Sequence, residues 1–350
     1  QPASLSAQGL APYQGLLFLS AGSKAELRAE LAKKVEGLRA GQEHTPALPS
    51  PEALALPERV VIDYADPAEL LKRAERALGA FDSDTPAGWQ AMMAHGVYRG
   101  SGRAGKLAYL FPGQGSQYVN MIKDLRQYEP VVVDTFDEAD RILEPILGRP
   151  LTSFIYVEGG EEELAQAEKN LKDTTITQPA MLTANVALYR VLSKFGFKPD
   201  MVIGHSLGEY AALVASGVLT FAEALEVVSA RGQEMKKVSM EDNGCMAAVS
   251  APLGEVEKIL AGLSGYVVLA NINSPLQSVL GGDTPSVDAA IAAFTAAGFQ
   301  AVKIPVSHAF HTKIVAPASE PLRRVIEKMN IQPPRIPIVA NVTGELYPQT

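Results

Sequence analysis

A serine between two glycines, at the junction of an apolar run and a helical pattern, most constrains how this chain folds. The turn is Gly204-His205-Ser206-Leu207-Gly208; it follows Met201-Val202-Ile203, and helix-forming residues continue from Glu209. A G-x-S-x-G turn of this kind is crowded and strained, so a side chain at either glycine would clash. We therefore expect a strand, a sharp turn that carries Ser206, and a helix, as in a nucleophile elbow. The alternative is a chance Gly/Ser turn. The apolar run before the turn and the helix-forming residues after it make this alternative the less favoured one.

Composition excludes several classes of protein. The 350 residues suit two or three compact units, and the net charge of −8 disfavours nucleic acid as a partner. The single cysteine, Cys245, excludes an internal disulfide framework and a Cys-rich zinc site, and it fits a reducing cytoplasm. No apolar run is long enough for a membrane span, and the N-terminus has no signal pattern. Because the sequence begins with Gln1, we expect a piece of a longer chain.

The expected fold class is α/β, and residues 1–104 are expected to form a small α/β linker domain. No catalytic residue types gather there, so an adaptor role is expected. Four prolines favour a loop over 41–58. The remaining patterns predict strands at 16–19 and 60–62 and helices at 25–38 and 67–81.

Residues 105–243 and 305–350 are expected to form an α/β-hydrolase-like core. Strands alternate with helices there, which predicts a parallel sheet covered on both faces. The expected strands are 107–111 and 201–203, with returns to the sheet at 306–311 and 338–340. Helical patterns lie at about 131–147, 161–170, 178–195 and 221–237.

Between these segments, residues 244–304 show a different order of elements. The patterns predict strands at 245–249, 267–272, 278–280 and 300–304, with helices at 252–263 and 284–297. The order βαββαβ is typical of a ferredoxin-like subdomain, here inserted into the core. Because ligand sites favour domain interfaces, we expect a cleft between the two with Ser206 at its floor.

A serine hydroxyl needs a base, usually histidine, to become a nucleophile. Of the five histidines, His44 and His95 lie in the first domain, where solvent exposure is the simpler explanation. His205 adjoins the serine, but side chains at adjacent positions of a sharp turn diverge. The pair His308 and His311 remains, and the residues alone do not choose between them.

Five motifs occur together in one order. They are Pro112-Gly113-Gln114-Gly115-Ser116-Gln117, Thr177-Gln178-Pro179-Ala180, the serine turn with Glu209-Tyr210-Ala211-Ala212-Leu213, Arg231-Gly232-Gln233-Glu234-Met235, and His308-Ala309-Phe310-His311. Over residues 105–350 the combination resembles the malonyl-CoA:acyl-carrier-protein transacylase family, as found in acyltransferase domains of polyketide synthases. The first hundred residues are similar to the linker between a ketosynthase and its acyltransferase. The run Gln117-Tyr118-Val119-Asn120-Met121 resembles iterative synthases of the enediyne type.

The resemblance implies a role for each reacting group. Ser206 attacks the thioester carbonyl and becomes acylated, and His311 is the general base. The backbone N–H groups of Leu207 and Gln114 stabilise the oxyanion. The acid of a hydrolase triad is missing, because no carboxylate between Ser206 and His311 stands convincingly at a strand end. In the family a backbone carbonyl from a C-terminal segment orients the histidine, and we expect that carbonyl to lie beyond Thr350.

The resemblance also implies the substrate. The residues alone place Arg231 on a solvated helix surface, whereas in the family this arginine forms a bidentate pair with the free carboxylate of a malonyl group. A monocarboxylic acyl group such as acetyl would leave the buried charge unpaired. The tetrapeptide 308–311 resembles malonyl-selective domains, in which Phe310 fills the space beside the acyl α-carbon. One methyl group is worth only about 1–3 kcal/mol, so leakage is expected.

The expected function is therefore malonyl transfer from malonyl-CoA, through a seryl ester, to the phosphopantetheine thiol of an acyl carrier protein. Ketosynthase and other synthase domains are the further expected partners, and no metal or permanently bound cofactor is expected. Alternatives are a serine hydrolase or thioesterase, and a non-catalytic structural domain.

The further substrate-binding candidates are His205, His308 and Gln178, and residues 271–273 are expected to line the pocket. Lys236 and Lys237 are candidates for carrier docking.

Overall fold

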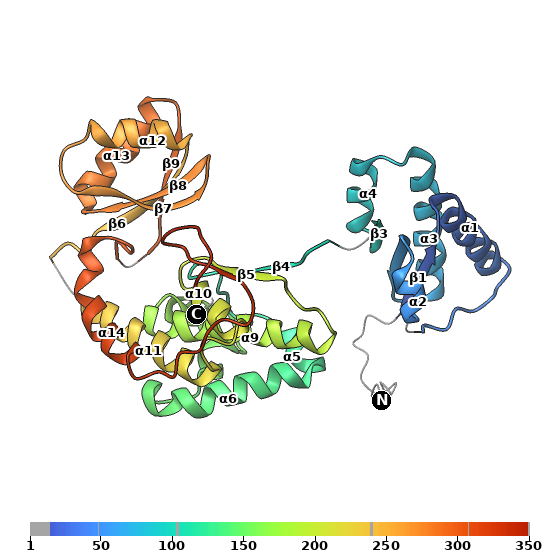
Figure 1. Cartoon of the computed structure of the whole chain (residues 1–350), viewed down its shortest axis with the longest axis horizontal. Helices are drawn as coiled ribbons and strands as arrows, with labels where there is room; N and C mark the ends of the chain where they lie inside the picture. Colours follow the sequence, from blue (N-terminus) through green and yellow to red (C-terminus); the bar gives the residue numbers. More distant parts are fainter. Residues whose placement is uncertain (1–14, 48, 103–104, 239–240, 307, 349–350) are drawn as a thin grey trace. The chain divides into compact units, whose positions relative to one another are not determined.

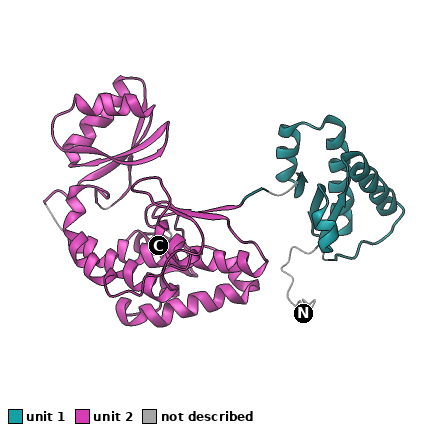
Figure 2. Cartoon of the chain, in the orientation of Figure 1, with its two compact units in different colours: residues 1–106 teal, residues 107–350 magenta. Residues whose placement is uncertain are grey.

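The computed structural model describes residues 15–47, 49–102, 105–238, 241–306 and 308–348. The chain divides into two compact units, residues 1–106 and residues 107–350 (Figure 2). The sequence-based boundary, between 104 and 105, lies two residues from this division.

Unit 1 is a three-stranded antiparallel sheet with helices packed against it. The order is β1-β2-β3, and Leu17 and Ile62, which are register partners, are both buried. Leu27 and Leu31 of the first helix and Leu70 of the third complete this core. The elements are β1 (Gly15–Ala21), α1 (Lys24–Arg39), α2 (Pro51–Ala55), β2 (Glu58–Tyr64), α3 (Pro67–Ser83), α4 (Pro86–Met93) and β3 (Val97–Ser101).

The expectation of a pure loop over 41–58 was wrong, because α2 lies within it. Ser50 accepts a hydrogen bond from the Ala53 N–H, and Pro51 occupies the first helical position. A capping serine followed by proline starts a helix in the way that Asp66-Pro67 starts α3. The four prolines therefore marked a helix start as well as a loop.

The main part of unit 2 is a short parallel sheet with helices packed against it (Figure 1). The expected cover on both faces was wrong for β4, where Leu110 is 73% exposed. The strand order is β10-β5-β4, and the helices α6, α9, α10 and α11 supply most of its buried apolar residues. The elements are β4 (Ala108–Phe111), α5 (Lys123–Tyr128), α6 (Pro130–Leu147), α7 (Thr152–Ile155), α8 (Glu161–Leu171), α9 (Thr174–Lys194), β5 (Met201–Gly204), α10 (Gly208–Ala215), α11 (Phe221–Lys237), η1 (Lys313–Ala318), α14 (Ser319–Ile326) and β10 (Ile338–Val339).

Only one of the two expected returns to this sheet forms a strand. β10 pairs in parallel with β5, with Ile338 opposite Val202. The described residues of 306–311 form no strand. The Phe310 N–H instead donates to the His308 carbonyl, and His311 has a left-handed φ of 58°, so the chain turns where a strand would have to run straight.

Residues 245–304 fold as a four-stranded antiparallel sheet with two helices. The elements are β6 (Cys245–Ser250), α12 (Leu253–Ala261), β7 (Val267–Ser274), β8 (Gln277–Gly282), α13 (Thr284–Ala296) and β9 (Gln300–Ile304), and the strand order is β7-β8-β6-β9. Figure 1 shows α12 and α13 on the sheet face away from α10 and α11. Strand side chains alternate between faces, so Val249 and Leu280 pack with Phe294 of α13, while Met246 and Val279 cluster with Phe310. This second face closes over the serine turn.

Candidate active site

The serine turn stands between β5 and α10, packed against the end of β4. Ser206 has a left-handed φ of 51°. A Cβ on Gly204 would lie 2.1 Å from the Gly208 carbonyl carbon, and one on Gly208 would lie 2.1 Å from the Phe111 oxygen. The expected clash at both glycines is therefore confirmed, and it arises from backbone that cannot move aside.

The turn presents the serine hydroxyl to a histidine 105 residues further along the chain. Ser206 Oγ lies 2.7 Å from His311 Nε2. His311 itself has a left-handed φ. Strained non-glycine backbone of this kind concentrates at functional sites, where the surrounding structure enforces it.

The structure separates the two histidines that the residues alone left equal. His308 is buried, and its Nε2 lies 2.9 Å from the Val238 carbonyl oxygen. It is not among the described residues that line the pocket around Ser206. The ring of His308 lies 6.0 Å from the ring of Phe310. Its binding of substrate stays a prediction.

The environment keeps His311 neutral at neutral pH. Although part of the residue reaches solvent, the surrounding pocket walls withdraw water from the imidazole, and this lowers the pKa of His311 to about 4. Electrostatic interactions with Arg231 and, less strongly, with His205 lower the pKa of His311 further. A neutral ring that accepts at Nε2 carries its proton on Nδ1, so it is ready to take the serine proton.

The pocket at this dyad has a volume of about 120 Å³. The sheet of β6 to β9 supplies one polar lining residue and half of the apolar ones, and the other lining residues come from the rest of unit 2. The lining residues are Gln114, His205, Ser206, Leu207, Arg231, Met246, Asn271, Val279, Ile304, Val306, Phe310 and His311. The sequence reading missed Met246, Val279, Ile304 and Val306. Strand alternation could have placed the first two on a single face, although not at this site.

Arg231 enters the pocket from α11. Burial lowers the pKa of its guanidinium, and Tyr210 and Glu209 act in the opposite direction. Among the described residues, none makes a hydrogen bond or a close ion pair with this guanidinium. A half-buried cation left in this state attracts an anionic ligand beside the serine.

Two backbone N–H groups beside Ser206 have no acceptor within the described part of the chain, those of Leu207 and Gln114. Both residues line the pocket. The 112–117 turn approaches closely, because a Cβ on Gly113 would lie 2.4 Å from the His205 oxygen, and Asn185 Nδ2 donates to the Pro112 carbonyl at 2.9 Å. These N–H groups are therefore available to a negatively charged oxygen.

Residues 108–349, more than half of the chain, match the family described as acyl transferase domain. The chain belongs to this acyltransferase family.

Two curated relatives show where such a domain occurs. The acyltransferase is 34% identical over 341 residues to the spectinabilin polyketide synthase system protein NorB of Streptomyces orinoci, covering 96% of this chain and 15% of that protein. It is 37% identical over 246 residues to the malonyl CoA-acyl carrier protein transacylase of Bacillus subtilis, covering 69% of this chain and 74% of that enzyme.

Solved structures agree. The acyltransferase domain from module 8 of the salinomycin polyketide synthase aligns with a TM-score of 0.78 at 26% identity, covering 96% of this chain and 76% of that one. A malonyl-transacylase solved in complex with a type II polyketide synthase acyl-carrier protein aligns with a TM-score of 0.62 at 35% identity, covering 69% of this chain and 76% of that chain. The α/β fold of this acyltransferase is that of its relatives.

The remaining predicted residues lie in different settings. His205 lines the pocket, and its Nε2 lies 3.0 Å from Asn273 Oδ1. Gln178 is outside the described lining: it is buried in α9 with its Nε2 3.6 Å from Met235 Sδ, because that face of α9 packs on α11. Lys236 pairs with Asp173 and Lys237 pairs with Glu234. Both lysine side chains are exposed, so their part in carrier docking stays a prediction.

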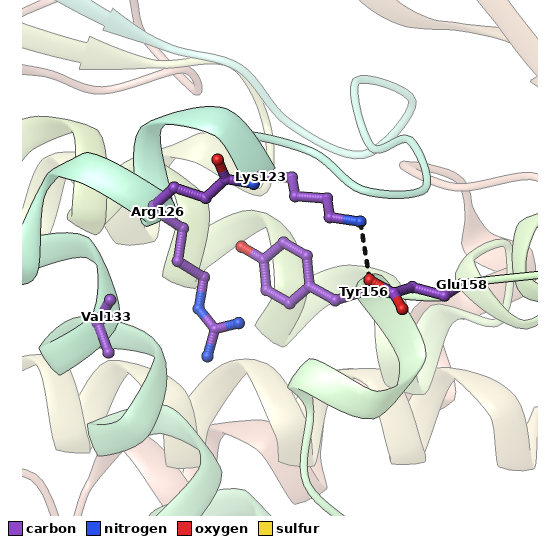
Figure 3. Close-up of a pocket in the computed structure, with 6 residues that line it drawn as sticks. Lys123, Arg126, Val133, Tyr156 and Glu158 are labelled. Carbon is purple, nitrogen blue, oxygen red and sulfur yellow. Dashed lines mark hydrogen bonds and ion pairs between the residues drawn. The ribbon is translucent and has the colours of Figure 1, made fainter. Parts of the chain in front are cut away.

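A second cavity of about 340 Å³ lies beside α5 and α6 and shares no described lining residue with the first. Figure 3 shows Tyr156 between Lys123 and Arg126. The Arg126 guanidinium lies over the Tyr156 ring at 4.7 Å, and Lys123 Nζ lies 3.4 Å from Glu158 Oε1. Among the described residues Arg126 Nε is buried without a hydrogen-bond partner, and no serine, cysteine or histidine belongs to the described lining of this cavity.

Within the ranges that the structure describes, no three His, Cys, Asp or Glu side chains group in a way that could hold a metal ion. Over the same ranges, no helix has the length and apolar character to cross a membrane.

Proposed function

We propose that this acyltransferase moves a malonyl group from malonyl-CoA, through an ester on Ser206, to the phosphopantetheine thiol of an acyl carrier protein. The observation that carries the proposal is the 2.7 Å contact between Ser206 Oγ and His311 Nε2 beside the unpaired guanidinium of Arg231.

In the first half-reaction His311 Nε2 takes the proton of Ser206 as Oγ bonds to the thioester carbonyl carbon. The carbonyl oxygen becomes negative and accepts from the N–H groups of Leu207 and Gln114, each worth about 3 kcal/mol in sites of this type. The carbon–sulfur bond then breaks, and His311 returns the proton to the departing CoA thiolate. The product is malonyl-Ser206 and free CoA.

The second half-reaction runs the same steps with a new nucleophile. His311 takes the proton of the phosphopantetheine thiol, and the sulfur attacks the ester carbonyl. The bond to Ser206 Oγ breaks, and His311 returns the proton to that oxygen. Over the cycle malonyl-CoA and the carrier thiol are consumed, free CoA and the malonyl-carrier thioester are produced, and Ser206 and His311 return to their starting state, so atoms and charge balance.

Arg231 selects a dicarboxylic acyl group. Its fork pairs with a planar carboxylate through two hydrogen bonds, and an acetyl group would leave the buried charge without a partner. Phe310 and Met246 bound the apolar side of the pocket, where an α-substituent would have to fit. The arrangement supports malonyl as the preferred group and a modest penalty for methylmalonyl.

We extend the proposal to the architecture. Residues 244–304 act as a ferredoxin-like subdomain that covers an α/β-hydrolase-like core, and unit 1 is the linker to a ketosynthase in a cytoplasmic polyketide synthase. Support comes from the 96% coverage of this chain by the synthase protein NorB and from the relative solved with its acyl-carrier protein. An enediyne-type synthase is the finer assignment, supported by residues 117–121.

Intact-protein mass spectrometry after mixing with malonyl-, methylmalonyl- and acetyl-CoA tests the proposal. We expect a malonyl adduct on the native chain, a smaller amount of methylmalonyl adduct, and no adduct with Ser206→Ala. An acetyl adduct as large as the malonyl one would contradict the role of Arg231. Continued release of CoA beyond one equivalent per chain without an acceptor would indicate a hydrolase, and no adduct with any thioester would indicate a structural domain.

A further inference from the structure

The strand β10 ends beside the serine turn. Its backbone hydrogen bonding to β5 ends before it reaches Asn341. Its register pairs Val339 with Ile203, so continuation by two residues brings Asn341 opposite His205. The backbone N–H of Asn341 leaves the ladder, however, and donates to Glu209 Oε1 at 2.8 Å. The Asn341 backbone N–H is therefore not the donor to the Gly204 carbonyl that a continued parallel sheet would require.

The side-chain amide of Asn341 fills that position. Its Nδ2 donates to the Gly204 carbonyl at 2.6 Å, and its Oδ1 accepts from the Ser206 N–H at 2.7 Å. In a parallel ladder a residue bonds in this way to the residues before and after its partner. Since Gly204 O can only accept and Ser206 N–H can only donate, the orientation of the amide is fixed.

These two bonds act on the nucleophile. They hold the peptide groups on both sides of His205, and so they hold Ser206 in its left-handed conformation with Oγ toward His311. They also occupy the Ser206 N–H, which leaves the Leu207 N–H as the donor that the turn offers to an oxyanion.

We propose that Asn341 is a positioning residue for Ser206, with its side-chain amide standing in for a peptide group of the sheet. The inference deepens the proposed function and rests on Ser206 as the nucleophile. An asparagine suits the position because one short side chain must both donate and accept. An aspartate of the same size would set a carboxylate oxygen against the Gly204 carbonyl oxygen and remove the donor.

Asn341→Asp tests this, with Asn330→Asp on the unit 2 surface as the matched control. We expect a loss in kcat for malonyl transfer on the order of 10²-fold, the cost of misplacing a reacting group by about 1 Å, with KM little changed. The control should match the native chain. A kcat for Asn341→Asp within threefold of native would overturn the proposal.

The pH profile separates positioning from general damage. A carboxyl group beside a carbonyl oxygen has a raised pKa, and once protonated it can donate to Gly204 as the amide does. The activity of Asn341→Asp relative to native should therefore rise as the pH falls from 7 toward 5, a range in which His311 is still neutral. A ratio that does not change with pH would contradict the inference.

Two further measurements keep the result interpretable. Asn341→Leu, which has the same shape and no polar atoms, should lose activity at every pH; each variant is assayed well below its own melting temperature. Labelling of Ser206 by a fluorophosphonate should slow in parallel with kcat. If the native chain is labelled but takes no malonyl, the proposed function fails, and the labelling rates still test the role of Asn341.

Discussion

Ser206 and His311 are both held in left-handed backbone, although neither is glycine. Each such residue costs of order 1–3 kcal/mol, so the surrounding contacts must enforce the conformation. At Ser206 these are the two bonds from Asn341 and the crowded glycines. At His311 the next residue contributes, since Thr312 Oγ1 donates to the Ala309 carbonyl. The dyad is thus assembled from two strained turns that lie far apart in the sequence.

Acylation should depend on pH through His311. Because its pKa is lowered to about 4, the ring is neutral and able to accept a proton at all pH values well above 4. We expect kcat/KM for malonyl-CoA to stay level from pH 8 to about pH 5 and to fall as the pH drops through about 4. A stopped-flow measurement of CoA release checks this. An acid limb near pH 6.5, the ordinary histidine value, would contradict the burial of the ring.

Arg231→Gln should change two observables at once. The substitution removes the guanidinium that binds the malonyl carboxylate, so we expect malonyl loading to fall at least tenfold relative to acetyl loading. Loss of the positive charge also removes a cause that lowers the pKa of His311, so the acid limb should move to higher pH. Competition between the two thioesters, read by mass spectrometry, gives the first result, and the pH profile gives the second. Unchanged malonyl preference would contradict the role of Arg231.

For single residues, local geometry was predictable from the sequence, whereas contacts between distant segments were not. The serine turn and its glycines were predictable because their geometry is local. The residues alone did not choose His311 over His308, although the family resemblance did, since the choice depends on a turn at 308–311 that follows an inserted subdomain. Asn341 could not be predicted at all, because its role depends on the register between β10 and β5.

At the scale of elements, Gly208→Ala should unfold the serine turn. The added methyl group would lie 2.1 Å from the Phe111 carbonyl oxygen, which belongs to β4 and cannot move aside. We expect a loss of more than about 2 kcal/mol in the free energy of unfolding. Gly254→Ala in α12 is the matched control: it meets nothing within 4 Å and should gain roughly 0.4–1 kcal/mol. Urea unfolding measures both, and equal effects would contradict the close packing.

Tyr156→Phe should stabilise the region of α5 to α7. The Tyr156 hydroxyl is buried without a hydrogen-bond partner among the described residues, and burial raises its pKa to about 12. Removing such a hydroxyl should raise the free energy of unfolding by up to about 1 kcal/mol. Tyr189→Phe is the control, since that hydroxyl donates to the Ala215 carbonyl and its loss should cost about 1 kcal/mol. A lower melting temperature for Tyr156→Phe would show that the hydroxyl has a partner such as water.

Helices whose ends carry capping residues were predicted with bounds close to the observed ones. The bounds of α11, Phe221–Lys237, agree with the sequence because Thr220 and Glu223 form a capping box at its start. The segment 306–311 was mistaken for a strand because its apolar residues serve a turn that packs against Met246 and Val279. Short apolar runs do not distinguish these cases, since tertiary contacts decide them.

At the scale of the molecule, every residue that lines the pocket around Ser206 lies in unit 2. Unit 1 has a hydrophobic core of its own, formed by its sheet and its helices α1 and α3. The sequence placed the boundary between the units within two residues, because the catalytic motifs all follow it. The described lining of the pocket and the core of unit 1 therefore belong to separate parts of the chain.

This separation predicts that residues 107–350 alone load malonyl. The dyad, Arg231, Asn341 and the two oxyanion donors all belong to that fragment, so its initial rate of Ser206 acylation should be within about threefold of the full chain, a difference of less than 1 kcal/mol in the barrier. The fragment 1–106 should take no label, and it should still show a cooperative thermal transition from its own core. Mass spectrometry of both fragments with malonyl-CoA is the measurement. A folded 107–350 fragment that remains unlabelled would mean that unit 1 contributes to the site, and the division of roles would be wrong.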